Sequence, residues 1–364
     1  MSLTVGFDIS SIPYNRGVSR YTANLLRALA KKKQVHIRTI GASFRQQSEL
    51  RSFMKSDLPG VPYKILPHPV KIMDIVWNRL HVMSPEWFLG DLDIFHSWEM
   101  QPPLKKAKLV STIHDLAMLR FPKTADPYVL AMNERSWKHI RKEAKAVIAV
   151  SEATKKDIVE FLQIEPERVF VVHEALPAEA KQRVTSTRRK EVLEFYSLNK
   201  PYIFFIGTLE PRKNLKRLIE AWKPMKKELD LVLAGAVGWE SLPKEEGLRL
   251  LGPVSNEHLA ALLGGAEALA YPSLYEGFGL PILDGFYHKI PVVTSNTSSM
   301  TEVAGNAAVL VNPKDEVDIR RGLEVAVKEK TLYARRGVAR LKQFSSWDRV
   351  ADQTIEVYRK AIEQ

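Results

Sequence analysis

Cysteine is absent from the 364 residues of this chain. Disulfide bridges, thiolate zinc sites and cysteine nucleophiles are therefore excluded, and the lack of disulfides fits a reducing compartment. Long apolar runs are missing too: runs such as residues 202–206 fall far below the roughly 18 residues that a membrane-spanning helix needs. The first ten residues also lack the charged start and apolar stretch of a signal peptide. We expect a cytoplasmic protein that contacts a membrane only peripherally, at its inner face.

Acidic residues are in the minority. Lysine and arginine number 54 against 42 aspartates and glutamates, which gives a net charge of +12. This balance favours anionic partners: phosphates, nucleic acid or an acidic membrane surface. Nucleic acid is disfavoured, because the basic residues come without stacked aromatics or a helix-turn-helix pattern. The composition is otherwise that of an ordinary globular protein, and the length predicts two domains of about 150 residues or more.

Short apolar runs alternate with longer amphipathic ones, which indicates an α/β fold with parallel sheets covered by helices. The alternation stops in a polar, basic stretch at residues 181–190, where we expect the join between two doubly wound, Rossmann-like domains with a cleft between them. The expected strands are residues 3–9, 35–40, 93–97, 109–113, 146–150, 169–173, 202–207, 231–235, 248–251, 268–271, 292–294 and 308–311. The expected helices are residues 20–31, 72–81, 128–142, 152–162, 215–227, 257–263, 280–287, 317–328, 332–343 and 347–362.

Two motifs of the first half follow strands, and parallel sheets bind ligands beyond the carboxyl ends of their strands. Gly17 opens a predicted helix, where a glycine lets the backbone approach a ligand and the helix N-terminus favours an anion. His114 can bond a sugar hydroxyl or a phosphate, and Asp115 is expected to orient it. Each motif also has an ordinary explanation, a turn glycine or a capped helix start. The GxGxxG fingerprint of dinucleotide-binding domains is absent.

The motifs of the second half are more specific. Arg212 and Lys213 follow Gly207 at the end of a strand, where an arginine fork and a lysine point charge suit a diphosphate leaving group. Glu276 lies in a loop with two glycines and a proline, and we expect it to accept hydrogen bonds from sugar hydroxyls. Asp284 falls in the following helix, and a carboxylate suits a ribose diol because it accepts two hydrogen bonds.

Two further features adjoin the Glu276 loop. The backbone amides of residues 278–280 are expected to face the same space as the Glu276 carboxylate. Residues 295–305 add hydroxyls at Thr297, Ser298, Ser299 and Thr301, together with Glu302, which either cap a helix that faces a diphosphate or simply cap a helix N-terminus.

These motifs resemble those of the retaining glycosyltransferases of family 4, which have the two-domain GT-B fold. The resemblance covers nearly the whole chain. It implies an acceptor-side domain over residues 1–177, a nucleotide-sugar donor domain over residues 178–345, and a last helix, residues 346–364, that packs back on the first domain. The residues that carry it are 17–21, 114–116, 149–152, 207–214, 252–254, 276–284 and 346–347.

Carried over position by position, the resemblance makes Glu276 the acid that binds donor-sugar hydroxyls and Asp284 the acid that binds the ribose. Lys213 matches the lysine at the diphosphate, Gly17 the glycine of the N-terminal loop, and His114 a histidine near the donor sugar. Val254 lies where the family contacts the base. The implied donor-binding set is Gly17, Gly207, Arg212, Lys213, Val254, Glu276, Gly277, Phe278, Gly279, Leu280 and Asp284, and the implied catalytic set is His114, Arg212, Lys213 and Glu276.

Two positions depart from the family pattern. Asp284 is one methylene shorter than the usual glutamate, which changes the ribose contact. Thr208 stands where many members have arginine, and Arg212 is expected to supply that charge, with help from Arg16 and Arg20.

The resemblance implies transfer of a hexosyl unit from a nucleotide-diphosphate sugar to an acceptor hydroxyl, with retention and with no cofactor and no essential metal. The basic cluster and helix N-termini would stabilise the leaving diphosphate. The His-Asp-Leu and Glu-Pro-Arg-Lys patterns resemble those of mannosyltransferases in this family, which favours GDP-mannose as the donor, with a UDP-hexose next. The acceptor is expected to be a saccharide or a lipid-linked molecule, as in polysaccharide biosynthesis.

Other functions stay open on the sequence alone. A GT-B-like nucleotide-sugar 2-epimerase would need further acid and base residues, which the sequence does not single out. A non-catalytic, two-lobed ligand-binding protein of the periplasm would carry a signal peptide, which is not seen. Most basic residues are interpreted as solvated surface, and those of the first half also as a contact for an anionic membrane that carries the acceptor.

Overall fold

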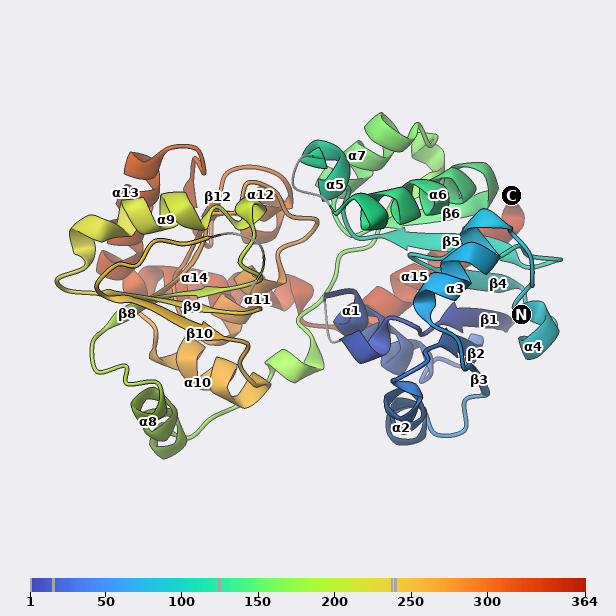
Figure 1. The fold of residues 1–364 in the computed structure, drawn as a ribbon, viewed down its shortest axis with the longest axis horizontal. Helices are drawn as coiled ribbons and strands as arrows, with labels where there is room; N and C mark the ends of the chain where they lie inside the picture. The colour runs from blue at the N-terminus through green and yellow to red at the C-terminus, as the bar shows by residue number, and fades with distance from the viewer. Residues whose placement is uncertain (1, 15–16, 123–125, 237, 239–240) are drawn as a thin grey trace. The chain divides into compact units, whose positions relative to one another are not determined.

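The computed structural model describes residues 2–14, 17–122, 126–236, 238 and 241–364. They form two compact units (Figure 1). Unit 1 consists of Met1–Glu174 and Ser346–Gln364, and unit 2 consists of Ala175–Ser345. Among the described residues, no helix combines the length and the apolar character of a membrane-spanning segment.

Unit 1 is built on a parallel sheet with the strand order β3-β2-β1-β4-β5-β6-β7. The final helix of the chain, α15, belongs to this unit, where it packs on α1, β5 and β6. Its Tyr358 is fully buried and lies 2.7 Å from His96 of β4 (Oη to Nδ1). The elements are β1 (Leu3–Asp8), α1 (Gly17–Leu29), β2 (Val35–Ala42), α2 (Gln47–Asp57), β3 (Tyr63–Leu66), α3 (Val70–Met73), the π-helical turn η2 (Asp74–Arg79), α4 (Glu86–Leu89), β4 (Ile94–Ser97), β5 (Lys108–Ile113), α5 (Ala117–Arg120), α6 (Pro127–Glu143), β6 (Ala144–Ala149), α7 (Glu152–Leu162), β7 (Val169–Val171) and α15 (Trp347–Glu363).

Unit 2 repeats this architecture with the parallel strand order β10-β9-β8-β11-β12-β13. The ends of β8 and β9 approach each other so closely that a Cβ atom on Gly235 would lie 2.0 Å from the carbonyl oxygen of Gly207, which explains a glycine there. The elements are α8 (Ser186–Phe195), β8 (Tyr202–Ile206), α9 (Leu215–Trp222), β9 (Asp230–Ala234), β10 (Leu248–Gly252), α10 (Asn256–Gly265), β11 (Ala268–Tyr271), α11 (Leu280–Tyr287), β12 (Val292–Ser295), α12 (Ser299–Ala304), β13 (Val309–Val311), α13 (Glu316–Lys328) and α14 (Lys330–Leu341).

The predicted α/β architecture is confirmed, and each strand expected from the sequence is present. The elements that were not predicted include β3, α2, α4, α5 and α8. The strand β3 is short and lies at the edge of its sheet, with Tyr63 and Lys64 exposed. The helix α8 overlaps the polar stretch that was interpreted as a join. It has no apolar face to reveal it in the sequence, since Val192 is its one buried residue. The predicted helix over residues 72–81 is divided into α3 and the turn η2.

Candidate functional site

The topological switch point of unit 2 lies between β8 and β11. The chain leaves β8 toward β9 on one side of the sheet, whereas β11 and β12 continue on the other side. The loops after β8 and β11 therefore diverge at this point, which is where open parallel sheets bind ligands. Four predicted site residues, Gly207, Arg212, Lys213 and Glu276, lie in these two loops.

A buried ion-pair cluster joins the two loops. Glu276 accepts from Arg212 (Nη1 to Oε2, 2.9 Å) and from Lys213 (Nζ to Oε1, 2.7 Å). Arg212 also donates to Glu210 (2.6 Å), and Lys213 to the Tyr271 hydroxyl (2.8 Å). Lys213 and Glu276 are 8% and 7% exposed. Two carboxylates and two cations thus neutralise one another, with Glu276 and Lys213 buried and Arg212 and Glu210 half-buried.

Opposing effects act on the protonation of this cluster. Burial raises the pKa of the Glu276 carboxyl, but the charges of Arg212 and Lys213 outweigh it and lower the pKa from 4.5 to about 2. Burial lowers the pKa of Lys213, against the attraction of Glu276. The Glu276 carboxylate is therefore ionised throughout the physiological range.

Serine hydroxyls support the loop that carries Glu276. Ser298 donates to the Glu276 carbonyl (2.6 Å), and Ser299 donates to the carbonyls of Glu276 and Phe278 (2.8 and 3.0 Å). The N-cap residue of α12, Ser298, makes no side-chain capping bond. These two hydroxyls therefore hold the Glu276 loop in place. Capping of the helix, one of the two expectations, is not what their side chains do.

The remaining predicted residues of unit 2 surround this loop in sequence. Residues 277–279 are buried, and Gly279 has φ 103°, a conformation that favours glycine, just before α11 begins at Leu280. Asp284 lies in the second turn of α11 and is 5% exposed. Val254 is half-buried in the turn between β10 and α10.

In unit 1, His114 follows β5 and is held by a carboxylate that sequence reasoning missed. Its Nδ1 lies 3.1 Å from Oε1 of Glu174, which follows β7 at the same edge of the sheet. Asp115, expected to orient the ring, accepts instead from the backbone N–H of Ala117 (2.9 Å). An acidic residue directly after a predicted strand was the signal that could have identified Glu174.

Glu174 leaves the second ring nitrogen of His114 available. Because a carboxylate only accepts, Nδ1 carries the proton in the neutral ring and Nε2 is an acceptor. This Nε2 is buried and has no partner within the described part of the chain, and the same holds for Nε1 of Trp98, which follows β4. Tyr21 packs edge-on against both rings, with centroids 4.7 Å from His114 and 6.4 Å from Trp98.

Gly17 is the first residue of α1, as predicted for a loop that opens a helix. A Cβ atom at this position would meet no atom within 4 Å, among the residues that the structure describes. Packing of the chain itself therefore gives no reason for a glycine here. Arg16, expected to assist at the diphosphate, lies outside the described residues.

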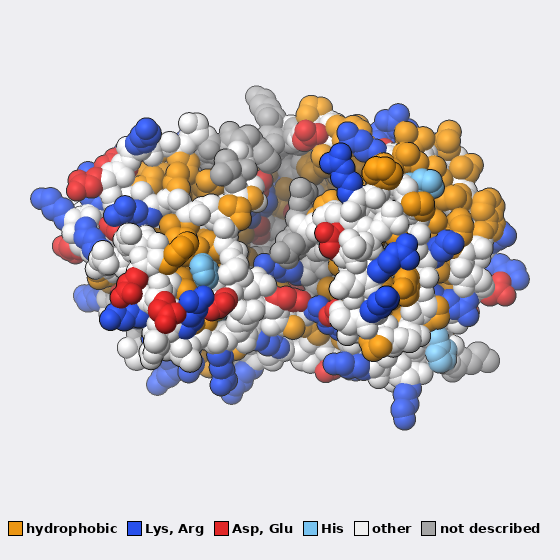
Figure 2. All heavy atoms as spheres, turned by 60° about the horizontal axis from the view of Figure 1, so that its bottom comes forward, with side chains coloured by type: hydrophobic (Ala, Val, Ile, Leu, Met, Phe, Trp, Pro, Cys, Tyr) orange, Lys and Arg blue, Asp and Glu red, His pale blue; other side chains and the backbone are white. Residues whose placement is uncertain are grey.

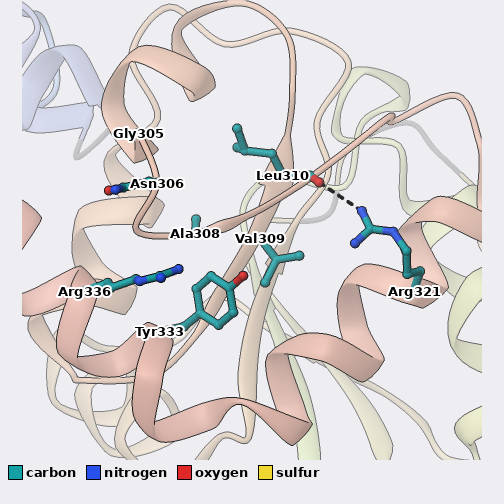
Figure 3. Close-up of a pocket in the computed structure, with 8 residues that line it drawn as sticks. All are labelled: Gly305, Asn306, Ala308, Val309, Leu310, Arg321, Tyr333 and Arg336. Carbon is teal, nitrogen blue, oxygen red and sulfur yellow. Dashed lines mark hydrogen bonds between the residues drawn. The ribbon is translucent and has the colours of Figure 1, made fainter.

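A separate hollow of about 440 Å³ lies on unit 2 between β13, α13 and α14 (Figure 3). Tyr333 and Arg336 line it from α14, and Arg321 donates to the carbonyl of Leu310 (3.2 Å). None of the predicted site residues lines this hollow, so the candidate site rests on the residues at the strand ends.

Family profiles match both halves of the chain. The family profile "Glycosyltransferase Family 4" matches residues 15–179, and the profile "Glycosyl transferases group 1" matches residues 189–341. The O-antigen chain mannosyltransferase B of Escherichia coli is 29% identical over 94% of this chain and 96% of that protein. The MMP alpha-(1->4)-mannosyltransferase of Mycolicibacterium hassiacum is 27% identical over 75% of this chain and 72% of that protein.

Solved structures share the fold at low identity. A glycosyltransferase from Rickettsia africae superposes with a TM-score of 0.73 at 15% identity, covering 100% of this chain and 99% of that one. Anabaena Alr3699/HepE in complex with UDP-glucose gives a TM-score of 0.73 at 14% identity, covering 97% and 98%. These likenesses confirm the GT-B fold expected from the sequence.

Proposed function

The chain belongs to family 4 of the glycosyltransferases, and from this premise we propose that it transfers a mannosyl unit from a nucleotide-diphosphate sugar to a saccharide hydroxyl, with retention of configuration. The buried cluster of Glu276, Arg212 and Lys213 carries the proposal. It lies at the sheet edge where ligands bind, and its ion pairs hold two cations in fixed positions. The names of the relatives favour a transferase over a 2-epimerase or a binding protein.

The cluster prepares the site for a leaving diphosphate. In the reaction the bond between the sugar C1 and the diphosphate oxygen breaks, a bond from C1 to the acceptor oxygen forms, and the acceptor proton passes to the diphosphate. Negative charge grows on the diphosphate, and cations held beforehand stabilise it without reorganisation. Glu276 fixes Arg212 and Lys213 for this task, and a carboxylate with about four lone-pair positions keeps room for sugar hydroxyls.

The proposal assigns the remaining residues as follows. Asp284 binds the ribose, and Val254 lies at the base. The backbone of residues 277–280 and of Gly17 and Gly207 approaches the donor. His114, with its Nε2 free to accept, bonds a donor-sugar hydroxyl. Glu276 is held by two cations, which reduces its power as a nucleophile, so attack and departure on the same face of the sugar are favoured.

The donor is proposed to be GDP-mannose, because relatives are named mannosyltransferases. A UDP-hexose is the second candidate, since the Anabaena structure holds UDP-glucose. A thermal-shift titration with GDP and UDP, followed by an assay with labelled GDP-mannose and a mannose-containing acceptor, tests the proposal. We expect GDP to raise the melting temperature and the label to appear in a longer saccharide. If neither nucleotide stabilises the chain and no label is transferred, the proposal is wrong.

An apolar, basic segment of unit 1 supports a further part of the proposal, contact with an anionic membrane that carries the acceptor. Residues 63–88 form this segment, whose two acids, Asp74 and Glu86, are both buried. Its bases Lys64, Lys71 and Arg79 are exposed. Figure 2 shows hydrophobic side chains gathered on unit 1, at the right, with Lys and Arg side chains among them. The exposed large hydrophobic residues of the segment are Tyr63, Ile72, Ile75, Leu80, Val82, Trp87 and Phe88.

Apolar side chains with basic neighbours suit the interface of an anionic leaflet, where each lysine or arginine contributes about 1 kcal/mol. Flotation with vesicles of phosphatidylcholine, with and without phosphatidylglycerol, tests this contact. We expect binding to the anionic vesicles that weakens with salt and is lost when Leu80 and Trp87 are both changed to Ser. The control is Phe195→Ser, at an exposed position of unit 2. Equal binding of all three proteins would refute the contact.

A further inference from the structure

A cluster of three metal-binding side chains lies in unit 1, on elements that carry none of the residues assigned to the transferase site. His81 follows the turn η2, and His139 and Glu143 lie one turn apart near the end of α6. Nε2 of His81 is 3.1 Å from Oε2 of Glu143, and Nδ1 of His139 is 3.0 Å from Oε1. One ligand atom from each residue lies within 4.8 Å of the other two.

The other ring nitrogens show which tautomers are present. Nδ1 of His81 lies 3.0 Å from the carbonyl oxygen of Trp77, and Nε2 of His139 lies 3.0 Å from that of Asn78. A carbonyl oxygen only accepts, so these two nitrogens carry protons. In each neutral ring the remaining nitrogen then carries a lone pair, and this lone pair faces an oxygen of Glu143. Both atoms are hydrogen-bond acceptors, so they repel each other. A cation between them removes this conflict.

One divalent ion satisfies the three groups better than two protons. The His81 and His139 rings are stacked, with centroids 4.0 Å apart and planes 9° apart. Two protons would place two imidazolium charges on each other against a single carboxylate. A metal ion instead accepts both lone pairs and the carboxylate, and histidine ligands are usually oriented by a carbonyl that accepts from their other nitrogen. The C-terminal end of α6, where Glu143 lies, also favours positive charge.

The backbone around His81 is unusual in a way that fits a binding site. The turn η2 is π-helical, a form often found at functional sites. His81 itself has φ 51°, in the left-handed region that residues other than glycine seldom adopt. Strain of this kind persists where surrounding contacts hold it in place. Here the contacts are those of the His81 ring with Trp77 and Glu143.

We propose that His81, His139 and Glu143 bind a zinc ion. Bonds of about 2.0–2.2 Å in a tetrahedral site separate ligand atoms by about 3.4 Å. Each histidine nitrogen lies 3.0 or 3.1 Å from one of the two Glu143 oxygens, and the three ligand atoms lie within 4.8 Å of one another. The three side chains are between 17% and 27% exposed, so a water molecule can take the fourth position. The ion would clamp the apolar, basic segment to α6.

Zinc binding by the full chain tests the proposal. After treatment with a chelator, the protein is titrated with ZnSO4 in competition with a chromophoric chelator, and with CoCl2 to record the visible bands of tetrahedral cobalt. We expect one high-affinity equivalent per chain and a rise in melting temperature with zinc. His139→Ala and Glu143→Gln should each lower the affinity at least about tenfold and abolish the cobalt bands. The control is the double variant His36→Ala, His68→Ala, which removes two exposed histidines of the same unit.

Circular dichroism confirms that each variant is folded before the comparison. Three results would overturn the proposal: no high-affinity equivalent in the parent chain, the same affinity in the parent and in both site variants, or loss of binding only in the control.

Discussion

Two buried carboxylates at the carboxyl ends of strands show how differently the two units are built. Asp8 ends β1 in unit 1 and is 1% exposed; Glu276 follows β11 in unit 2 and is 7% exposed. Burial raises the pKa of Asp8 from 3.8 to about 6, although the Ser10 hydroxyl and backbone N–H donate to it. At Glu276 the same effect of burial is overcome by two cations, and the pKa falls to about 2.

The pKa values of the two carboxyl groups shift in opposite directions because their neighbours differ, since both groups are buried. Unit 2 has fixed cations at its strand ends, as an anionic diphosphate requires. Unit 1 has no such cation pair among its described strand-end residues named above; it has the Asp8 and Glu174 carboxylates, the Ser10 hydroxyl, the Tyr21 ring and His114 there, and in the proposal these face uncharged hydroxyl groups. The two Rossmann-like sheets thus support the proposed division of labour, with the phosphate part of the donor on unit 2. The following changes test that comparison.

The largest effect is expected from Glu276→Gln. Loss of the carboxylate leaves Lys213 buried without a counter-charge and Arg212 with Glu210 as its remaining carboxylate partner, which costs about 3–5 kcal/mol. The loss of preorganised charge should lower kcat/KM for transfer by about 100-fold or more. Urea unfolding and initial rates measure the two effects. The control, Glu267→Gln, breaks a partly exposed pair with Lys330 and should cost less than about 1 kcal/mol. Equal effects of the two substitutions would contradict the assignment.

The pH dependence of stability should have opposite signs at the two carboxylates. The lowered pKa of Glu276 adds about 3 kcal/mol to the free energy of unfolding above pH 4.5, and this contribution is lost as the pH falls toward 2. The raised pKa of Asp8 does the reverse: its contribution is complete below pH 3.8 and is lost as the pH rises through 6. Between pH 4 and 7, the free energy of unfolding of Asp8→Asn should therefore rise relative to that of the parent by up to about 3 kcal/mol. Urea unfolding from pH 3 to 8 measures this, and parallel curves would contradict it.

A smaller effect is expected where His114 is held by its carboxylate. Glu174→Gln replaces the charged acceptor of the His114 Nδ1–H bond with a neutral amide oxygen. This weakens a hydrogen bond worth about 1.5 kcal/mol, so kcat/KM should fall by up to about tenfold. Asp115→Asn is the matched control, because an Asn side chain can still accept from the Ala117 N–H, and its rate should stay within about twofold of the parent. A larger loss in the control than in Glu174→Gln would restore Asp115 as the orienting residue.

The smallest change in stability is expected at Gly17. A methyl group there meets no described atom within 4 Å, so Gly17→Ala should leave the free energy of unfolding unchanged or raise it by about 0.5 kcal/mol. If the donor backbone contact is correct, the KM for the nucleotide sugar should nevertheless rise. Gly235→Ala is the contrast, because its methyl group would collide with Gly207 and destabilise the chain. An unchanged KM in Gly17→Ala would remove Gly17 from the site.

Strong local patterns made much of the fold predictable. The strands of both sheets are short apolar runs between polar turns, and α7 and α11 occupy the predicted ranges, residues 152–162 and 280–287. Elements were missed where the local sequence pattern does not show how the element packs in the folded unit. The helix α8 is polar on almost every side, and β3 is an edge strand of four residues. Their places are fixed by neighbours distant in sequence, such as α10 for α8.

For the site, the sequence alone determined which residue types stand after which strands: His114, Arg212, Lys213 and Glu276 were all identified from that position. Only the tertiary structure decided their partners. That Glu276 binds both cations, that Glu174 and not Asp115 holds His114, and that serines support the Glu276 loop depend on contacts between residues 22 to 64 positions apart. Local sequence sets backbone preference, whereas hydrogen bonds and ion pairs need the distance and burial that only packing of the sheets provides.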